Sequence, residues 1–295
     1  FMPKKLIGEI FEIKKLILKS LFADDELMEI FVLKGGNALD IAYKMHNRSS
    51  MDMDVSMDKD FNDYNLEVES VKKKLEIAFE KIFINTDYTA FDFNIIIKPR
   101  NRDEGSNKTW GGYCLEFKVI ESKIFDLENL ELTRKQAIPL GKHDSRKFTV
   151  DISRFEYTEL KEEIEFENMN IFVYSPLMIV NEKLRAICQQ MDEYTISKTK
   201  KQRARDFFDI HLILETLPKF KEEFYSEKNK VILTEIFNVK EVPLNLLNNI
   251  DKTYNYHEIG YSTLESTVSG NLQPFKFYFD YVINLVKKLN SFWEE

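Results

Sequence analysis

Up to about residue 174, segments in which hydrophobic residues recur at helical spacing alternate with segments in which they recur at every second position. Apolar residues at helical spacing predict helices over 3–22, 25–31, 37–45 and 65–84. Alternating patterns rich in β-branched residues predict strands over 51–57, 91–98, 112–122 and 147–153, and a strand or hairpin over 164–174. Helices and strands that mix without a regular repeat predict an α+β fold.

From Ser175 onward the pattern is helical. Ser175 suits the N-cap position and Pro176 the first helical position, so we expect a helix from there to about Met191. Further helices are expected over 204–217, 219–237 and 274–293. We therefore expect two domains, an α+β domain over 1–170 and a mostly helical domain over 171–295.

A pair of glycines marks the first candidate ligand site. Gly35 and Gly36 let the backbone approach a ligand closely, and Asn37 can cap a helix that begins there. Because a helix N-terminus presents free N–H groups, it attracts phosphate. The glycine turn therefore predicts a phosphate site.

Two carboxylates follow on one short strand. Asp52 and Asp54 point to the same face of that strand, and Met51, Met53 and Val55 point to the other. Like charges so close destabilise the fold unless a cation lies between them, and hard oxygen ligands suit Mg²⁺ or Mn²⁺. Together with the glycine turn, the pair predicts a site that handles a nucleoside triphosphate.

Two more carboxylates, Asp58 and Asp60, repeat this spacing and raise the possibility of a calcium loop. Met57 stands where such a loop needs glycine, and Asp63 stands where it needs glutamate. The run is therefore interpreted as a polar turn.

A single carboxylate, Asp151, lies in an otherwise apolar strand. If it is buried, it needs a partner or a metal. The alternative is an aspartate at a strand end that bonds to the following backbone.

Residues 33–39 and the run Arg48-x-Ser50-x-Asp52-x-Asp54 resemble the signature of the AbiEii/AbiGii-type nucleotidyltransferase toxins. This family is a branch of the DNA polymerase β-like nucleotidyltransferase superfamily. Asn37 departs from the threonine or serine of most members. Two further blocks, around Glu182-Lys183 and Arg205-Asp206, extend the resemblance over about residues 30–215.

The resemblance implies a polymerase β-like core and a metal-dependent transfer of NMP from an NTP to an acceptor hydroxyl. Its implied metal ligands are Asp52, Asp54 and Asp151, and its implied catalytic residues add Lys183 and Asp206. The implied nucleotide-binding residues are Lys34, Gly35, Gly36, Asn37, Ser50, Lys183 and Arg205. It further implies Mg²⁺ or Mn²⁺ as cofactor, an RNA acceptor such as the tRNA 3′ end, and an antitoxin partner in a toxin–antitoxin or phage-defence system.

Three alternatives remain open from the residues themselves. The chain can be a catalytically idle relative that binds nucleotide or RNA as a regulator. Arg205 and His211 also match the Arg-x₅-His spacing of HEPN-type ribonucleases. Finally, Lys183 and Arg205 can form salt bridges with Asp206 or Asp209 that only join two helices.

Composition limits these functions only loosely. The chain has 295 residues, 43% of them hydrophobic, with 24 phenylalanines, which is enough for a sizeable core. A net charge of −8 means that RNA must be held by a local basic patch, for which residues 198–205 are the candidate. Two cysteines and no apolar run of about 18 residues predict a cytoplasmic protein without disulfides or membrane spans.

Overall fold

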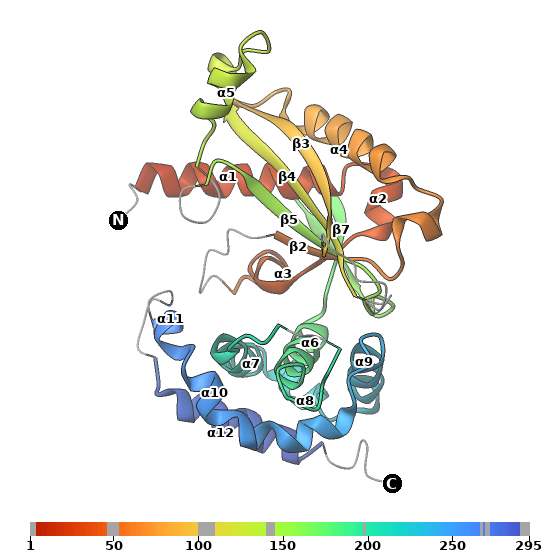
Figure 1. Cartoon of the computed structure of the whole chain (residues 1–295), viewed down its shortest axis with the longest axis vertical. Coiled ribbons are helices and arrows are strands. Elements are labelled where there is room, and N and C mark those ends of the chain that lie inside the picture. The colour runs from red at the N-terminus through yellow and green to blue at the C-terminus, as the bar shows by residue number, and fades with distance from the viewer. Residues whose placement is uncertain are drawn as a thin grey trace. The chain divides into compact units, whose positions relative to one another are not determined.

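The fold is described from a computed structural model of the chain (Figure 1). The structure describes residues 4–45, 53–99, 110–139, 145–196, 199–265, 268 and 272–289. Contacts between residues divide the chain into two units, the first formed by residues 1–42 and 49–173 and the second by residues 43–48 and 174–295.

The first unit is built on a seven-stranded mixed sheet with the order β3-β4-β5-β2-β1-β7-β6. Its strands are β1 (Val32–Lys34), β2 (Met53–Ser56), β3 (Tyr88–Lys98), β4 (Gly112–Glu121), β5 (Phe148–Ser153), β6 (Glu162–Phe166) and β7 (Met169–Val173). β2 pairs with β5 and β1 with β7 in parallel, whereas the other pairs are antiparallel. The edge strand β6 carries three glutamates, which oppose pairing with another sheet edge.

Helices of the first unit pack on this sheet (Figure 1). They are α1 (Lys4–Leu21), α2 (Asp25–Ile30), α3 (Gly35–Ala42), α4 (Val68–Phe83) and α5 (Leu130–Gln136), with short 3₁₀ turns η1 (Phe61–Tyr64) and η2 (Ser122–Ile124). α1 packs against α4, and α4 against β3. α1 buries Ile13, Ile17 and Leu21 completely, as its helical spacing requires.

Phenylalanines form much of the core between α4 and the sheet. Phe117 of β4 lies at the centre of this cluster, with its ring centroid 4.9 Å from Phe79, 5.3 Å from Phe93 and 5.3 Å from Phe148. Because each aromatic side chain buries a large apolar area, the cluster joins α4 firmly to three neighbouring strands. This fixes the half of the sheet that carries β5.

Asp60 is a structural anchor in the turn after β2. Its carboxylate accepts a hydrogen bond from Tyr113 at 2.5 Å and pairs with the Arg154 guanidinium. The Arg154 guanidinium also donates to the carbonyl oxygen of Trp110 at 3.3 Å. These bonds tie the turn after β2 to β4 and to the chain after β5, in keeping with the interpretation of Asp58 and Asp60 as a polar turn.

The second unit is helical. It contains α6 (Pro176–Cys188), α7 (Ala204–Thr216), α8 (Pro218–Glu223), α9 (Glu227–Asn238), η4 (Leu244–Thr253), α10 (Tyr254–Glu258), α11 (Tyr261–Glu265) and α12 (Phe275–Lys287). α6 packs against α7 and α9, and α7 packs against α12. Ser175 accepts from the N–H of Met178 at 3.3 Å, and Pro176 occupies the first helical position, as expected from the sequence.

The predicted α+β fold is confirmed, with four differences in detail. β1 was not predicted, and neither was α5. The single helix expected over 219–237 is divided into α8 and α9 by residues 224–226. Asn37 does not cap α3, because that helix begins at Gly35 and Asn37 lies buried within it. Among the described residues, none of the helices combines the length and hydrophobicity that a membrane span requires.

Candidate functional site

A row of polar side chains crosses the middle of the sheet in the first unit. Lys34 of β1 is the register partner of Asp54 of β2, which is the partner of Asp151 of β5. Asp151 is in turn the partner of Cys114 of β4. Because register partners on neighbouring strands lie on the same face, these four side chains form one line on one face of the sheet.

Asp54 takes its position from the alternation of β2. Met53 is 1% exposed and Val55 is fully buried, so the apolar residues face the core as the sequence predicted, and Asp54 faces the other way. Ser50 and Asp52, which the sequence also assigns to this site, lie outside the described residues. The structure therefore brings Asp54 and Asp151 together on adjacent parallel strands.

Gly35 lies directly against Asp54. It has a φ of +67°, a conformation that costs a residue with a Cβ about 1–2 kcal/mol. A Cβ at this position would lie 3.3 Å from Oδ2 of Asp54. Glycine is thus needed both for the turn from β1 into α3 and for the space that Asp54 occupies.

Asp151 is not the buried lone aspartate that its apolar strand suggested. Its side chain is 47% exposed, and Oδ1 accepts a hydrogen bond from Nζ of Lys98 at 2.6 Å. Burial lowers the pKa of Lys98, but the hydrogen bond and charge of Asp151 outweigh it and raise that pKa above its ordinary value. Asp151 lies within β5 rather than at its end, so the alternative of a strand-end aspartate is also wrong.

Lys34 and Asn37 are both buried, at 8% and 1% exposure. Nζ of Lys34 lies 3.9 Å from Oε1 of Glu156, whose side chain is 6% exposed. Gly36 occupies the first turn of α3. The nucleotide-binding roles of these residues stay predictions.

The donors of this row fit a divalent ion of the Mg²⁺ type. Among the described residues, no three His, Cys, Asp or Glu side chains are grouped so that they could hold a metal. Mg²⁺ does not need such a cage, because it commonly binds through one or two carboxylates and keeps several waters. Asp54 and Asp151 provide two hard oxygen donors on neighbouring strands.

In the second unit, Lys183 of α6 is held between two carboxylates of α7. Nζ of Lys183 lies 2.9 Å from Oδ1 of Asp206 and 2.7 Å from Oδ2 of Asp209, and all three side chains are at most 16% exposed. Burial disfavours the charged forms, but their mutual attraction outweighs it. The pKa of Lys183 is therefore raised and the pKa of Asp206 lowered.

This buried cluster, Lys183 with Asp206 and Asp209, contains the salt bridges between Lys183 and the two aspartates that the alternative expected. Arg205 does not take part in it, because its side chain is exposed in the first turn of α7. The cluster joins α6 to α7. The catalytic roles assigned to Lys183 and Asp206 stay predictions, as does nucleotide binding by Arg205.

Arg205 and His211 do not converge. Six residues apart on α7, they are rotated by about 120° from one another around the helix axis. The His211 ring packs against three aromatic rings, with centroids 5.1 Å from Phe277, 5.3 Å from Tyr278 and 4.8 Å from Tyr281. Burial lowers the pKa of His211. This geometry offers little support for a ribonuclease centre.

The basic run 198–205 is only partly available to a ligand. The Lys200 ammonium donates to backbone carbonyls at the end of α6, and Arg203 lies 3.6 Å from Asp206. Lys201 and Arg205 are exposed. Lys198 lies outside the described residues.

Sequence reasoning missed Lys98, Glu156 and Cys114 as members of this site. Lys98 ends β3 beside a polar loop, Glu156 follows β5, and Cys114 resembles an ordinary core residue of β4. Burial and the nearby Asp151 raise the pKa of the Cys114 thiol. Only the strand order brings these residues to the row of side chains formed by Lys34, Asp54 and Asp151, and no sequence pattern encodes that order.

The family profile described as nucleotidyl transferase AbiEii toxin, type IV TA system, matches residues 16–252. A solved structure from H. pylori, assigned as a nucleotidyltransferase, is similar over 100% of both chains, with 18% identity and a TM-score of 0.50. An antigenic nucleotidyltransferase-like protein from Paracoccidioides brasiliensis is 14% identical, covering 87% of this chain and 95% of its own, with a TM-score of 0.36. No curated protein matches the sequence. Since the profile covers most of the chain, the protein belongs to the AbiEii family of nucleotidyl transferase toxins of toxin–antitoxin systems.

Proposed function

We propose that the chain transfers NMP from a nucleoside triphosphate to the hydroxyl of an RNA acceptor, the 3′ end of a tRNA, and that it needs Mg²⁺ or Mn²⁺ to do so. Family membership implies a nucleotide substrate and an antitoxin partner. The metal, the RNA acceptor and a role in phage defence are our proposal. The observation that carries it is the register pairing of Asp54 with Asp151.

Asp54 and Asp151 would hold the ion, and Asp52, two residues before Asp54 in the sequence, is the third proposed ligand. When bound, such an ion supplies a Lewis acid at the phosphates and lowers the pKa of an attacking hydroxyl. Asp151 can accept the proton of that hydroxyl, since its side chain is 47% exposed.

Gly35 and Gly36 would let the phosphates approach the backbone at the start of α3, since a helix N-terminus attracts phosphate. Lys98 would balance the negative charge that builds up when a triphosphate and the two carboxylates meet. Its ammonium already lies 2.6 Å from Asp151. A point charge on a flexible side chain can move from the carboxylate to a phosphate.

The test is transfer of label from each of the four triphosphates to tRNA, with and without Mg²⁺. Asp54→Asn and Asp151→Asn should each reduce transfer by roughly 100-fold or more, because each removes a proposed metal ligand. Asp87→Asn is the matched control, since Asp87 is an exposed carboxylate outside the sheet. Full transfer by both site variants would refute the proposal, and absence of transfer by the unaltered protein would favour the idle alternative.

A further inference from the structure

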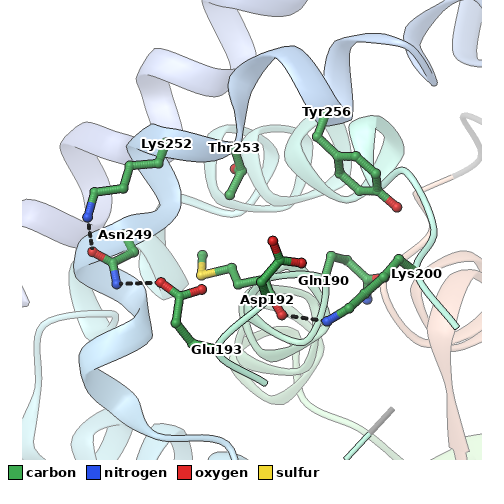
Figure 2. Close-up of a pocket in the computed structure, with 9 residues that line it drawn as sticks. Gln190, Asp192, Glu193, Lys200, Asn249, Lys252, Thr253 and Tyr256 are labelled. Carbon is green, nitrogen blue, oxygen red and sulfur yellow. Dashed lines mark hydrogen bonds between the residues drawn. The ribbon is translucent and has the colours of Figure 1, made fainter. Parts of the chain in front are cut away.

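The helical unit contains a pocket whose lining includes none of the proposed catalytic, metal-binding or nucleotide-binding residues. Its volume is about 290 Å³. The walls come from the turn after α6 (residues 190–193), from Lys200 and from one side of η4 and α10 (residues 249–256), as Figure 2 shows. The space holds about ten water-sized groups, which is the size of one nucleobase.

Two polar residues of the wall are already used within the protein. The Gln190 amide donates to the carbonyl oxygen of Ala186 at 2.7 Å and accepts from the N–H of Lys201 at 2.7 Å. The Lys200 ammonium donates to three backbone carbonyl oxygens within residues 189–194. Since an ammonium has three N–H groups, Lys200 has none left for a ligand. Gln190 and Lys200 therefore shape the pocket without recognising its contents.

Other polar residues can still bond to a ligand. Lys252 donates to Oδ1 of Asn249 at 2.8 Å, and Nδ2 of Asn249 lies 3.4 Å from Oε1 of Glu193. The hydrogen bonds among Lys252, Asn249 and Glu193 leave one carboxylate oxygen of Glu193 and further N–H groups of Lys252 available. In Figure 2, Asp192 lies between Tyr256 and this row of hydrogen-bonded side chains. Within the described part of the protein, no hydrogen bond of the Asp192 carboxylate is found.

The charges around the pocket cancel. Its lining carries the carboxylates of Asp192 and Glu193 and the ammonium groups of Lys200 and Lys252. A balanced lining with both donors and acceptors favours a neutral polar ligand over an ion, because it offers an ion no net opposite charge.

Tyr256 forms an aromatic wall of the pocket, and its ring is supported by the neighbouring His257 side chain. Its ring packs against the His257 ring, with centroids 5.1 Å apart and an interplanar angle of 70°. Nδ1 of His257 accepts from the backbone N–H of Arg203 at 3.0 Å. Burial lowers the pKa of His257 to about 4, so the ring is neutral near pH 7 and holds this arrangement without a charge.

We propose that this pocket binds a single nucleobase that carries an exocyclic amino group, with the base against the Tyr256 ring and the amino group donating to Asp192. Aromatic side chains bind unpaired bases by stacking, and carboxylates accept from base amino groups. The base can belong to a free nucleoside or to an unpaired nucleotide of RNA. Binding of a base in this pocket does not depend on the proposed transfer reaction. Only the binding of an acceptor RNA there would rest on that reaction.

The test is a ligand-observed NMR titration of the full chain with adenosine, cytidine, guanosine and uridine, without divalent metal. At least one of the nucleosides that carry an amino group (adenosine, cytidine or guanosine) should bind. The affinity for uridine should be at least about fivefold lower than the affinity for that nucleoside. Tyr256→Ala should weaken binding roughly 5- to 150-fold, and Tyr256→Phe should preserve it. Asp192→Ala, which removes the acceptor, should abolish the preference over uridine, whereas Asp251→Ala, at an exposed neighbour outside the pocket, should change nothing.

Several results would overturn the assignment. The first is that no nucleoside binds. The second is binding that Tyr256→Ala leaves unchanged, and the third is a preference over uridine that survives Asp192→Ala. Repeating the titration with a short single-stranded RNA that ends in the preferred base separates the two sources of the base. RNA that binds equally well to Tyr256→Ala would show backbone contacts only, against the proposal. Because nucleosides carry no phosphate and the titration lacks metal, its outcome is independent of whether the chain transfers NMP.

Discussion

Replacing Lys183 with methionine tests the energetics of the buried cluster of Lys183, Asp206 and Asp209. The substitution keeps most of the side-chain volume but leaves two carboxylates, 13% and 11% exposed, without their cation. Loss of one partner from a buried ion pair costs about 3–5 kcal/mol. Arg203 lies 3.6 Å from Asp206 and compensates in part, so we expect a loss of about 3 kcal/mol.

The measurement is urea unfolding followed by circular dichroism at several pH values. In the unaltered protein, the pKa of Asp206 is lowered on folding, so its contribution to stability is present above its ordinary value of 3.8 and is lost as pH falls through the folded pKa. Without Lys183, burial instead favours protonation of the carboxylates. The difference in unfolding free energy between the two proteins should therefore shrink as pH falls from 7 toward 4.

Lys276→Met is the matched control. Nζ of Lys276 also pairs with an aspartate, Asp280, at 2.6 Å, but the two side chains are 70% and 51% exposed. Such a pair contributes about 0–1 kcal/mol. A loss below about 1 kcal/mol for Lys183→Met, or a loss that does not change with pH, would refute the reasoning. A loss of the expected size with unchanged nucleotide affinity would assign Lys183 to the fold rather than to the triphosphate.

Three further predictions concern single residues. Gly35→Ala should destabilise the first unit by about 1–2 kcal/mol, seen as a lower thermal midpoint, because of its φ of +67°; an unchanged midpoint would contradict the turn geometry. Lys98→Met should increase Mn²⁺ affinity roughly two- to fivefold by calorimetry, since it removes a competing cation from Asp151, and a weaker affinity would argue against competition. His257 has a folded pKa of about 4 against an ordinary 6.5, so the folded state binds fewer protons between these values and stability should fall as pH drops through this window. His257→Gln, whose amide oxygen can still accept from a backbone N–H, should remove up to about 3 kcal/mol of that pH dependence in urea unfolding, and an unchanged dependence would show that another group causes it.

Local patterns predicted the elements that carry strong local signals. The alternation of Met53, Asp54 and Val55 gave the correct faces of β2, and Ser175 with Pro176 marked the start of α6. These signals depend on a few neighbouring residues, so a sequence is sufficient to recognise them. β1 has only three residues, and all three are buried. Such a short segment shows no alternation, so its sequence cannot be distinguished from the end of a helix.

Non-local features could not be predicted in the same way. The sequence identified Asp54 and Asp151 as candidates, but only the order of the strands makes them neighbours. Lys98 reaches Asp151 from the end of β3, two strands away from β5. The exposure of Asp151 likewise follows from which face of the sheet it occupies, and a run of apolar residues on one strand cannot show that.

The parallel pairing of β2 with β5 also determines when the site can form during synthesis on the ribosome. Asp54 emerges early, but its partner strand follows only after α4, β3, β4 and α5 have been made. A product released before Phe148 has no β5 and cannot assemble the two carboxylates. Under the proposed function, premature termination anywhere in that interval should therefore yield a fragment without transferase activity, and the active enzyme would exist only after most of the first unit has been synthesised.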